Sequence, residues 1–154
     1  MPNGPKQIKY KKTKKGKLKR LEFKTNSLKF GTIGLKAAES GIINSRQIEA
    51  ARQAITRKIK RKGKVWIRIF PNLPITSKPT GTRMGKGKGQ ISHWGARVSS
   101  GTVLFEVCGI NSNTIFLALK TGGAKLPIKT KIFNWFYKRQ IKQTQVKVWH
   151  PYKK

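Results

Sequence analysis

The segment with the clearest potential for chemistry is "RMGKGKG", residues 83–89. Its alternating glycines let the main chain approach a sugar–phosphate backbone closely, with N–H groups directed at the anion. The lysines add point charges, Arg83 can form a two-pronged contact with a phosphate or a guanine edge, and Met84 can lie against a base. We interpret the segment as a nucleic-acid-binding loop that takes its shape from its ligand; a flexible surface loop is the alternative. The predicted contacts are Arg83, Met84, Gly85, Lys86, Gly87, Lys88 and Gly89.

The glycine-rich loop does not match a nucleotide-binding P-loop. That motif needs four residues between its glycines and a Ser or Thr after the lysine. Here three residues separate Gly81 from Gly85, and no Ser or Thr follows Lys86. The segment also leads into a strand-like stretch instead of a helix. The loop chemistry therefore concerns a polymer backbone and not a nucleoside triphosphate.

Residues for catalysis or metal binding are few. The chain has two histidines, His93 and His150, one cysteine, Cys108, and no aspartate. No paired carboxylates, CxxC or HExxH spacing occurs, and the single cysteine excludes an internal disulfide. The sequence thus predicts no enzyme, no catalytic residue, no metal site and no cofactor.

Charge gives the strongest indication of the partner. The 36 Lys and Arg oppose four glutamates, for a formal net charge of +32. Such a surface needs an external polyanion: nucleic acid, an anionic membrane or an acidic protein. No apolar run approaches the roughly 18 residues needed to span a bilayer. We favour RNA because the charge extends over the whole chain. A nucleoid-type DNA-binding protein remains an alternative, although no hairpin carrying a minor-groove wedge is evident.

The chain divides into three predicted parts: a basic arm over residues 1–27, a body over 28–133 and a basic, aromatic extension over 134–154. Like charges hold the arm open in water, so we expect it to order only against a polyanion. The predicted RNA contacts in the arm are Lys11, Lys12, Lys14, Lys15 and Lys17.

A helix is predicted over residues 45–62. Asn44 and Gln47 have capping-box spacing, and Gly63 suits a left-handed stop. At 100° per residue, the apolar side chains of this segment share an arc of about 80° that faces a core. The cations predicted to face phosphates from the opposite half are Arg46, Arg57, Lys60 and Arg61.

The remaining body favours strands and one shorter helix. Residues 27–38 and "VWIRIF" at 65–70 read as strands, the latter ended by "PNLP". Residues 93–98 and 102–109 are expected to form an antiparallel hairpin through the short link 99–101. A helix over 112–123 with Ile115, Phe116 and Leu119 facing the core precedes a strand over 125–133, which Pro127 assigns to a sheet edge. The predicted fold class is α+β, a compact sandwich of a mainly antiparallel sheet with two helices on one face.

Several long motifs resemble the L-sixteen family of bacterial-type large-ribosomal-subunit proteins. The resemblance covers about residues 6–133. Its motifs are "KTKKGKLKR", "FGTIGLKA", "SRQIEAARQAITRKIKR", "GKVWIRIFPNLPITSKPTGTRMGKGKG", "HWGARVSSGTVLFEVCG" and "AKLPIKT". The segment from about residue 134 onward extends beyond the family pattern.

The resemblance implies a structural protein of the large ribosomal subunit that binds rRNA near the peptidyl-transferase centre. It also implies that the loop at 83–89 reaches toward aminoacyl-tRNA, that the protein joins late in assembly, and that neighbouring ribosomal proteins are partners. Lys78, Lys125 and Lys129 are further predicted RNA contacts.

Composition suggests where the protein is made. Of the 36 basic residues, 27 are Lys and 9 are Arg, as in products of AT-rich genes. The family match begins almost at Met1, so no cleavable transit peptide is expected. We therefore expect a protein of the mitochondrial ribosome, made inside the organelle, with a plastid or a bacterial cytoplasm as alternatives.

Overall fold

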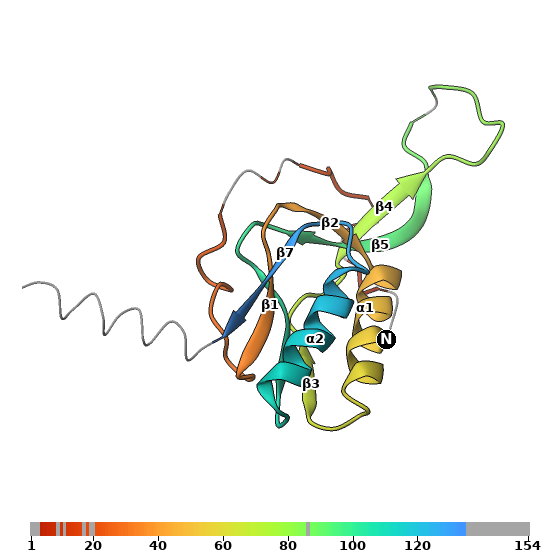
Figure 1. The fold of residues 1–154 in the computed structure, drawn as a ribbon. Coiled ribbons are helices and arrows are strands. Elements are labelled where there is room, and N and C mark those ends of the chain that lie inside the picture. The colour runs from red at the N-terminus through yellow and green to blue at the C-terminus, as the bar shows by residue number, and fades with distance from the viewer. Residues whose placement is uncertain are drawn as a thin grey trace, which may run out of the picture.

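The computed structural model describes residues 4–8, 10, 12–16, 18, 21–85 and 87–134. Two antiparallel sheets and two helices make up this part of the chain (Figure 1). In chain order the elements are β1 (Ile33–Ala37), β2 (Gly41–Asn44), α1 (Ser45–Lys58), β3 (Lys64–Ile67), β4 (Leu73–Ser77), β5 (Gln90–Val98), β6 (Val103–Cys108), α2 (Ser112–Gly123) and β7 (Thr130–Asn134). The predicted α+β class is confirmed, with two sheets where one was expected.

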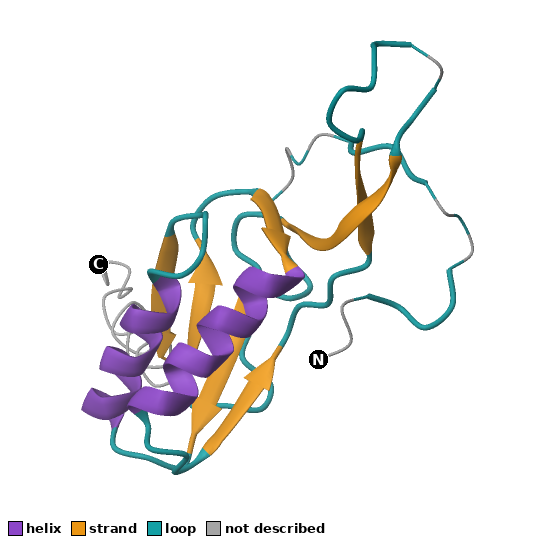
Figure 2. Cartoon of the chain, turned by 90° about the vertical axis from the view of Figure 1, so that its right-hand side faces the viewer, coloured by secondary structure: helices purple, strands orange, loops and turns teal. Residues whose placement is uncertain are grey.

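The larger sheet has the strand order β3-β6-β1-β7, and the two helices lie side by side on one of its faces (Figure 2). Its register aligns Val65 with Val107 and Val107 with Ile33, so these side chains share the helix-facing side. Ile48 and Ile55 of α1 and Ile115 of α2 cover them and are 0–1% exposed. This layer of aliphatic side chains is the core.

Side chains alternate between the two faces of the sheet along β3 and the two residues that follow it. Val65 and Ile67 pack against the core and Ile69 is buried, whereas Trp66 and Arg68 face the other side of the sheet, where Glu106 lies. The glycines of the β1 region permit the neighbouring backbone to approach closely. A Cβ on Gly34 would lie 3.1 Å from the Phe105 carbonyl oxygen.

The smaller sheet has the order β2-β5-β4, and the hairpin of β4 and β5 projects away from the helices (Figure 1). The sequence prediction missed β2 and β4. Pro74 lies inside β4 because that strand is at the sheet edge, where a missing N–H is tolerated. Residues 78–89, which we call the finger, connect the two strands.

The predicted hairpin of residues 93–98 with 102–109 is wrong. β5 belongs to the smaller sheet and β6 to the larger. The link turns a corner instead, since Gly101 has φ +93° and its N–H donates to the Ala37 carbonyl at 2.8 Å. Ala37 N–H in turn donates to the Thr102 carbonyl at 2.9 Å. The chain thus leaves β5 to pair with the end of β1.

Two details of the helices also differ from expectation. The α1 helix ends at Lys58, and Lys60 and Arg61 lie in a turn with φ 52° and 59°. In this turn the Arg61 N–H donates to the Thr56 carbonyl at 3.2 Å, and Gly63, which follows, also has a left-handed backbone, with φ +76°. Phe116 is 52% exposed, not in the core, because it is a quarter-turn away from buried Ile115.

Other predicted features are confirmed. Gln47 Oε1 accepts the Asn44 N–H at 2.9 Å at the start of α1, and Gly63 has φ +76° after its end. The α2 helix has the predicted bounds. The predicted last strand is at a sheet edge, but β7 begins at Thr130, so Pro127 lies before it and not inside it. Among the helices of the described residues, none is long and apolar enough to cross a membrane.

Candidate nucleic-acid interface

The finger exposes cations and an apolar side chain at the end of the β4–β5 hairpin. Met84 is 94% exposed, and Arg83 is also exposed. Gly85 and Gly87 have φ +93° and +83°, and a Cβ at either would meet nothing within 4 Å. Lys78 Nζ donates to the Gly85 carbonyl at 2.6 Å and closes the loop on itself. The main chain at these glycines is therefore accessible to a ligand backbone.

The basic arm contacts the base of the finger from far away in sequence. Lys12 Nζ donates to the Lys88 carbonyl at 2.6 Å, and Lys88 Nζ donates to the Thr13 carbonyl at 2.5 Å. Arg97 of β5 donates to the Lys14 carbonyl. Arm and finger thus form one cationic surface. Of the remaining predicted contacts here, Lys15 is exposed and Gly89 half-buried, whereas Lys11, Lys17 and Lys86 lie outside the described residues.

Within the described residues, no cation of the arm or finger forms an ion pair with a carboxylate. Glu106 pairs with Arg68, Glu49 with Arg52, and Glu39 with Lys129. The fourth, Glu22, accepts the backbone N–H of Lys24 at 2.9 Å. The counter-charge must therefore come from another molecule.

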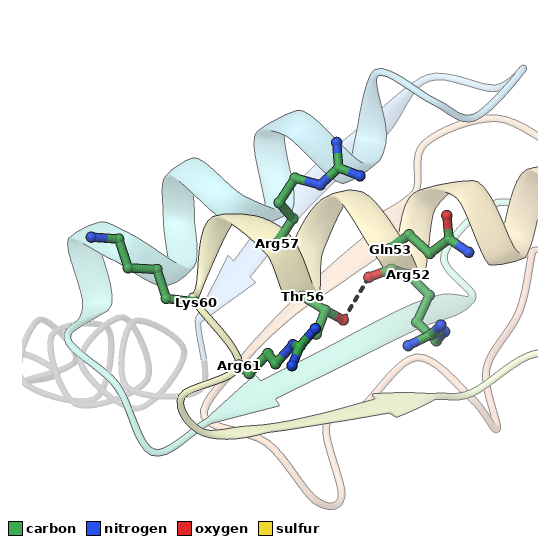
Figure 3. A pocket seen from close by; sticks show the side chains of 6 residues that line it. All are labelled: Arg52, Gln53, Thr56, Arg57, Lys60 and Arg61. Carbon is green, nitrogen blue, oxygen red and sulfur yellow. Dashed lines mark hydrogen bonds between the residues drawn. The ribbon is translucent and has the colours of Figure 1, made fainter.

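A second cationic surface follows the end of α1. A pocket of about 450 Å³, which we call the α1 exit pocket, lies here. Figure 3 shows Arg52 and Arg61 on either side of Thr56. The turn is fixed by Thr56, whose carbonyl accepts the Arg61 N–H at 3.2 Å and whose hydroxyl donates to the Arg52 carbonyl at 2.8 Å. The lining residues are Arg52, Gln53, Thr56, Arg57, Lys60 and Arg61.

Only one of the pocket's four cations has an acidic partner within the described residues. Arg52 pairs with Glu49 at 2.5 Å, and this hydrogen bond lowers the pKa of Glu49 although partial burial opposes the shift. Arg57, Lys60 and Arg61 form no ion pair there. Three of the cations that line the pocket are therefore without an acidic partner among the described residues.

Three predicted contacts lie elsewhere. Arg46 is exposed in the first turn of α1, where the helix dipole favours an anion over a cation. Lys125 and Lys129 are exposed on the connection between α2 and β7. Lys129 is 2.9 Å from Glu39, and this hydrogen bond raises the pKa of Lys129. These residues do not join the finger or the pocket in any described contact.

Sequence reasoning missed Arg97 and Arg52. Alternation in "HWGARV" places Arg97 opposite the buried Ala96 and Val98 and so could have identified it as surface-exposed. Arg52 lies only about 40° from Ile48 on the helical wheel, so the wheel assigned it to the margin of the apolar face. Its role at the pocket depends on the turn that follows the helix, which no local pattern indicates.

Within the described ranges, no group of three or more His, Cys, Asp or Glu side chains could hold a metal ion. The surfaces above are therefore characterised by hydrogen-bond donors and positive charge.

Comparison with known proteins agrees with this character. The family model described as ribosomal protein L16p/L10e matches residues 5–133. The chain is 54% identical over 127 residues to the large ribosomal subunit protein uL16 of Bartonella henselae. The aligned region covers 82% of this chain and 93% of the relative. It is 50% identical, with the same coverage, to the proteins of that name in Sinorhizobium fredii and Rhizobium meliloti.

Proposed function

Because the chain belongs to the ribosomal protein L16p/L10e family and is a structural constituent of the large ribosomal subunit, we propose that it binds large-subunit rRNA through the finger, the arm and the α1 exit pocket. The resemblance seen in its motifs is confirmed, and as a ribosomal protein the chain is not an enzyme. rRNA and other proteins of the large subunit are its partners.

The observation that carries the proposal is the uncompensated charge at the arm and finger. Lys12 and Lys88 donate to backbone carbonyls of the opposite segment, so their charges are held together without an acid. A phosphodiester backbone passing over this surface supplies the missing anions and accepts the remaining N–H donors. The predicted contacts at Lys14, Lys15, Arg83, Gly85 and Gly87–Gly89 form this first surface.

The second proposed surface is the α1 exit pocket, with Arg57, Lys60 and Arg61 as phosphate ligands. Its volume of about 450 Å³ accommodates a phosphate together with its ribose neighbours. Arg46, Lys125 and Lys129 are proposed as peripheral rRNA contacts. In this scheme residues 1–27 and 134–154 are RNA- or neighbour-contacting extensions of the body at 28–133.

We further propose that the protein lies near the peptidyl-transferase centre, where the finger shapes the region that receives aminoacyl-tRNA, and that it joins the subunit late. The support is the β4–β5 hairpin, which projects the finger away from the body (Figure 1). A protein whose surfaces order against folded RNA binds best after that RNA has formed.

The cellular compartment of the protein is proposed from its ratio of lysine to arginine. The excess of 27 Lys over 9 Arg supports a mitochondrial ribosome, whereas the relatives named above are bacterial and favour a bacterial cytoplasm. Fractionation of the source cells, with detection of the chain in organellar or cytosolic ribosomes, decides between them.

The finger is tested by replacing Arg83 and Lys88 together with alanine. We expect affinity for large-subunit rRNA fragments to fall about tenfold, because two phosphate contacts are lost, while circular dichroism and thermal unfolding stay unchanged. Co-sedimentation with large subunits should weaken in parallel. Arg83→Ala alone should reduce translation by purified ribosomes more than it reduces incorporation.

The matched control replaces Lys120 and Lys131, exposed cations of α2 and β7, with alanine. Equal losses in the two double variants would show that only net charge matters and would refute a specific role for the finger. An unfolded Arg83/Lys88 variant would instead make the finger part of the core.

A further inference from the structure

A fully buried carboxylate organises the outer face of the larger sheet. Glu106 of β6 is 0% exposed and pairs with the Arg68 guanidinium. Its Oε2 also accepts backbone N–H groups from Lys29 at 3.1 Å, Phe30 at 2.7 Å and Gly31 at 2.7 Å. Four donors thus converge on one carboxylate, and they fix the turn of residues 29–31 against the sheet.

This fixed turn exposes an aromatic ring. Phe30 is 58% exposed, although its backbone is anchored to a buried group. Its ring stacks on Trp66 with centroids 6.1 Å apart and an interplanar angle of 21°. The Arg68 guanidinium carbon is 5.2 Å from the Phe30 centroid. Trp66 and Arg68 therefore support Phe30, and the exposed area of the ring faces away from them.

The support comes from an extended strand. Arg68 continues β3, since its N–H donates to the Leu104 carbonyl at 2.9 Å. Residues two apart in an extended chain point the same way, so Trp66 and Arg68 approach Phe30 together from the sheet. The ion pair with Glu106 holds Arg68 in place. The four side chains form one packed unit in which the Phe30 ring is the most exposed member.

We infer that Phe30, Trp66 and Arg68 form a platform that stacks an unpaired nucleobase of RNA. The inference rests on the proposed rRNA-binding function and adds a base-contacting site to its phosphate-contacting surfaces. Unpaired bases are commonly recognised by stacking on aromatic rings beside arginine. Exposed Lys29, next in sequence, is available to the phosphate of the same nucleotide.

Charge favours RNA over a protein as the occupant. Glu106 is the acid of this region, and Arg68 already neutralises it. The lysines at positions 29 and 64, at the ends of the two supporting segments, are both exposed. A protein partner would have to supply acidic residues to this cationic rim, whereas a nucleotide brings an aromatic face and a phosphate in one group.

The platform is tested with the full chain and two ten-nucleotide probes of equal charge, oligoadenylate and the same oligomer without bases. Phe30→Leu keeps the backbone N–H bond to Glu106 and removes only the ring. We expect this variant to bind oligoadenylate about tenfold more weakly and the baseless oligomer unchanged. Phe30→Trp should restore wild-type affinity. A ten-nucleotide RNA containing 4-thiouridine should crosslink to Phe30 or Trp66 in the wild-type chain.

The control is Phe116→Leu, which removes a ring of similar exposure, 52%, from α2. It should change neither affinity. Unchanged binding of both probes by Phe30→Leu would overturn the platform and leave the rRNA-binding proposal intact. Equal weakening of both probes would assign Phe30 a structural role and also overturn it.

Two further outcomes separate the remaining possibilities. Normal RNA binding by Phe30→Leu with reduced incorporation into large subunits would identify a protein-docking surface and refute the platform. Failure of the wild-type chain to bind either probe, with no effect of the Arg83/Lys88 finger variant, would refute the proposed function itself.

Discussion

At the scale of single residues, the four glutamates of the chain differ in burial and in the groups that they contact. Glu39 and Glu49 form surface ion pairs, whereas Glu106 is buried and satisfies four donors. In a chain of net charge +32, a carboxylate placed inside contributes nothing to surface neutralisation. Its position is explained by the turn that it holds together and by Arg68, whose side chain is only 11% exposed and would be unfavourable there without a partner.

Glu106→Gln should therefore destabilise the protein by about 3 kcal/mol, because it leaves Arg68 uncompensated and turns an NH₂ group toward N–H donors. The side chain keeps its size, so no cavity contributes. Urea unfolding followed by circular dichroism measures the loss. Glu39→Gln, which breaks the exposed pair with Lys129, should leave the midpoint nearly unchanged. Similar midpoints for the two variants would contradict the role assigned to Glu106.

At the scale of elements, the sequence predicted the features that depend only on interactions between neighbouring residues. The cap at Asn44, the alternation of residues 65–69 and the bounds of α2 follow from interactions within a few residues. The pairing of strands, in contrast, depends on residues that are far apart in the sequence. Whether residues 102–103 pair with β5 or with β1 depends on Ala37, more than 60 positions away, and on the corner at Gly101. A link of suitable length for a hairpin can equally turn a corner between sheets.

A substitution at Gly63 tests what holds the turn after α1 in place. It has φ +76°, and a Cβ there would lie 2.4 Å from the Cys108 carbonyl oxygen. Gly63→Ala should cost about 2–3 kcal/mol, since left-handed strain adds to a contact with backbone that cannot move aside. Thermal or urea unfolding measures this loss.

The comparison for this prediction is Gly85→Ala in the finger. Gly85 also has φ +93°, but nothing lies within 4 Å of its Cβ position. An open loop can relax, so this substitution should cost about 1 kcal/mol or less. Equal losses at Gly63 and Gly85 would show that backbone strain alone, without the Cys108 contact, determines the effect.

At the scale of the whole molecule, the sequence predicted which segments form the candidate site but not how the fold brings them together. The run "RMGKGKG" and the basic arm identify themselves by residue type. Their contact does not, because Lys12 and Lys88 are 76 residues apart and meet only when β4 and β5 project from the body. Likewise, the Phe30 platform joins the segment before β1 to residues of β3 and β6. Charge density indicates the class of ligand, whereas tertiary structure decides which charges act together.

The extended cationic surface makes a quantitative prediction about salt. If the chain neutralises about ten phosphates, the slope of log affinity against log salt concentration should be about −7 to −9. Each lost phosphate contact should reduce its magnitude by about 0.7–0.9, so replacing Arg83 and Lys88 with alanine should give a slope shallower by about 1.4–1.8. Filter binding or fluorescence anisotropy across a salt series measures both values. The Lys120/Lys131 variant should keep the wild-type slope, because the cations of α2 and β7 are not assigned to phosphates. A wild-type slope shallower than about −3 would mean that the arm, finger and pocket do not bind RNA together.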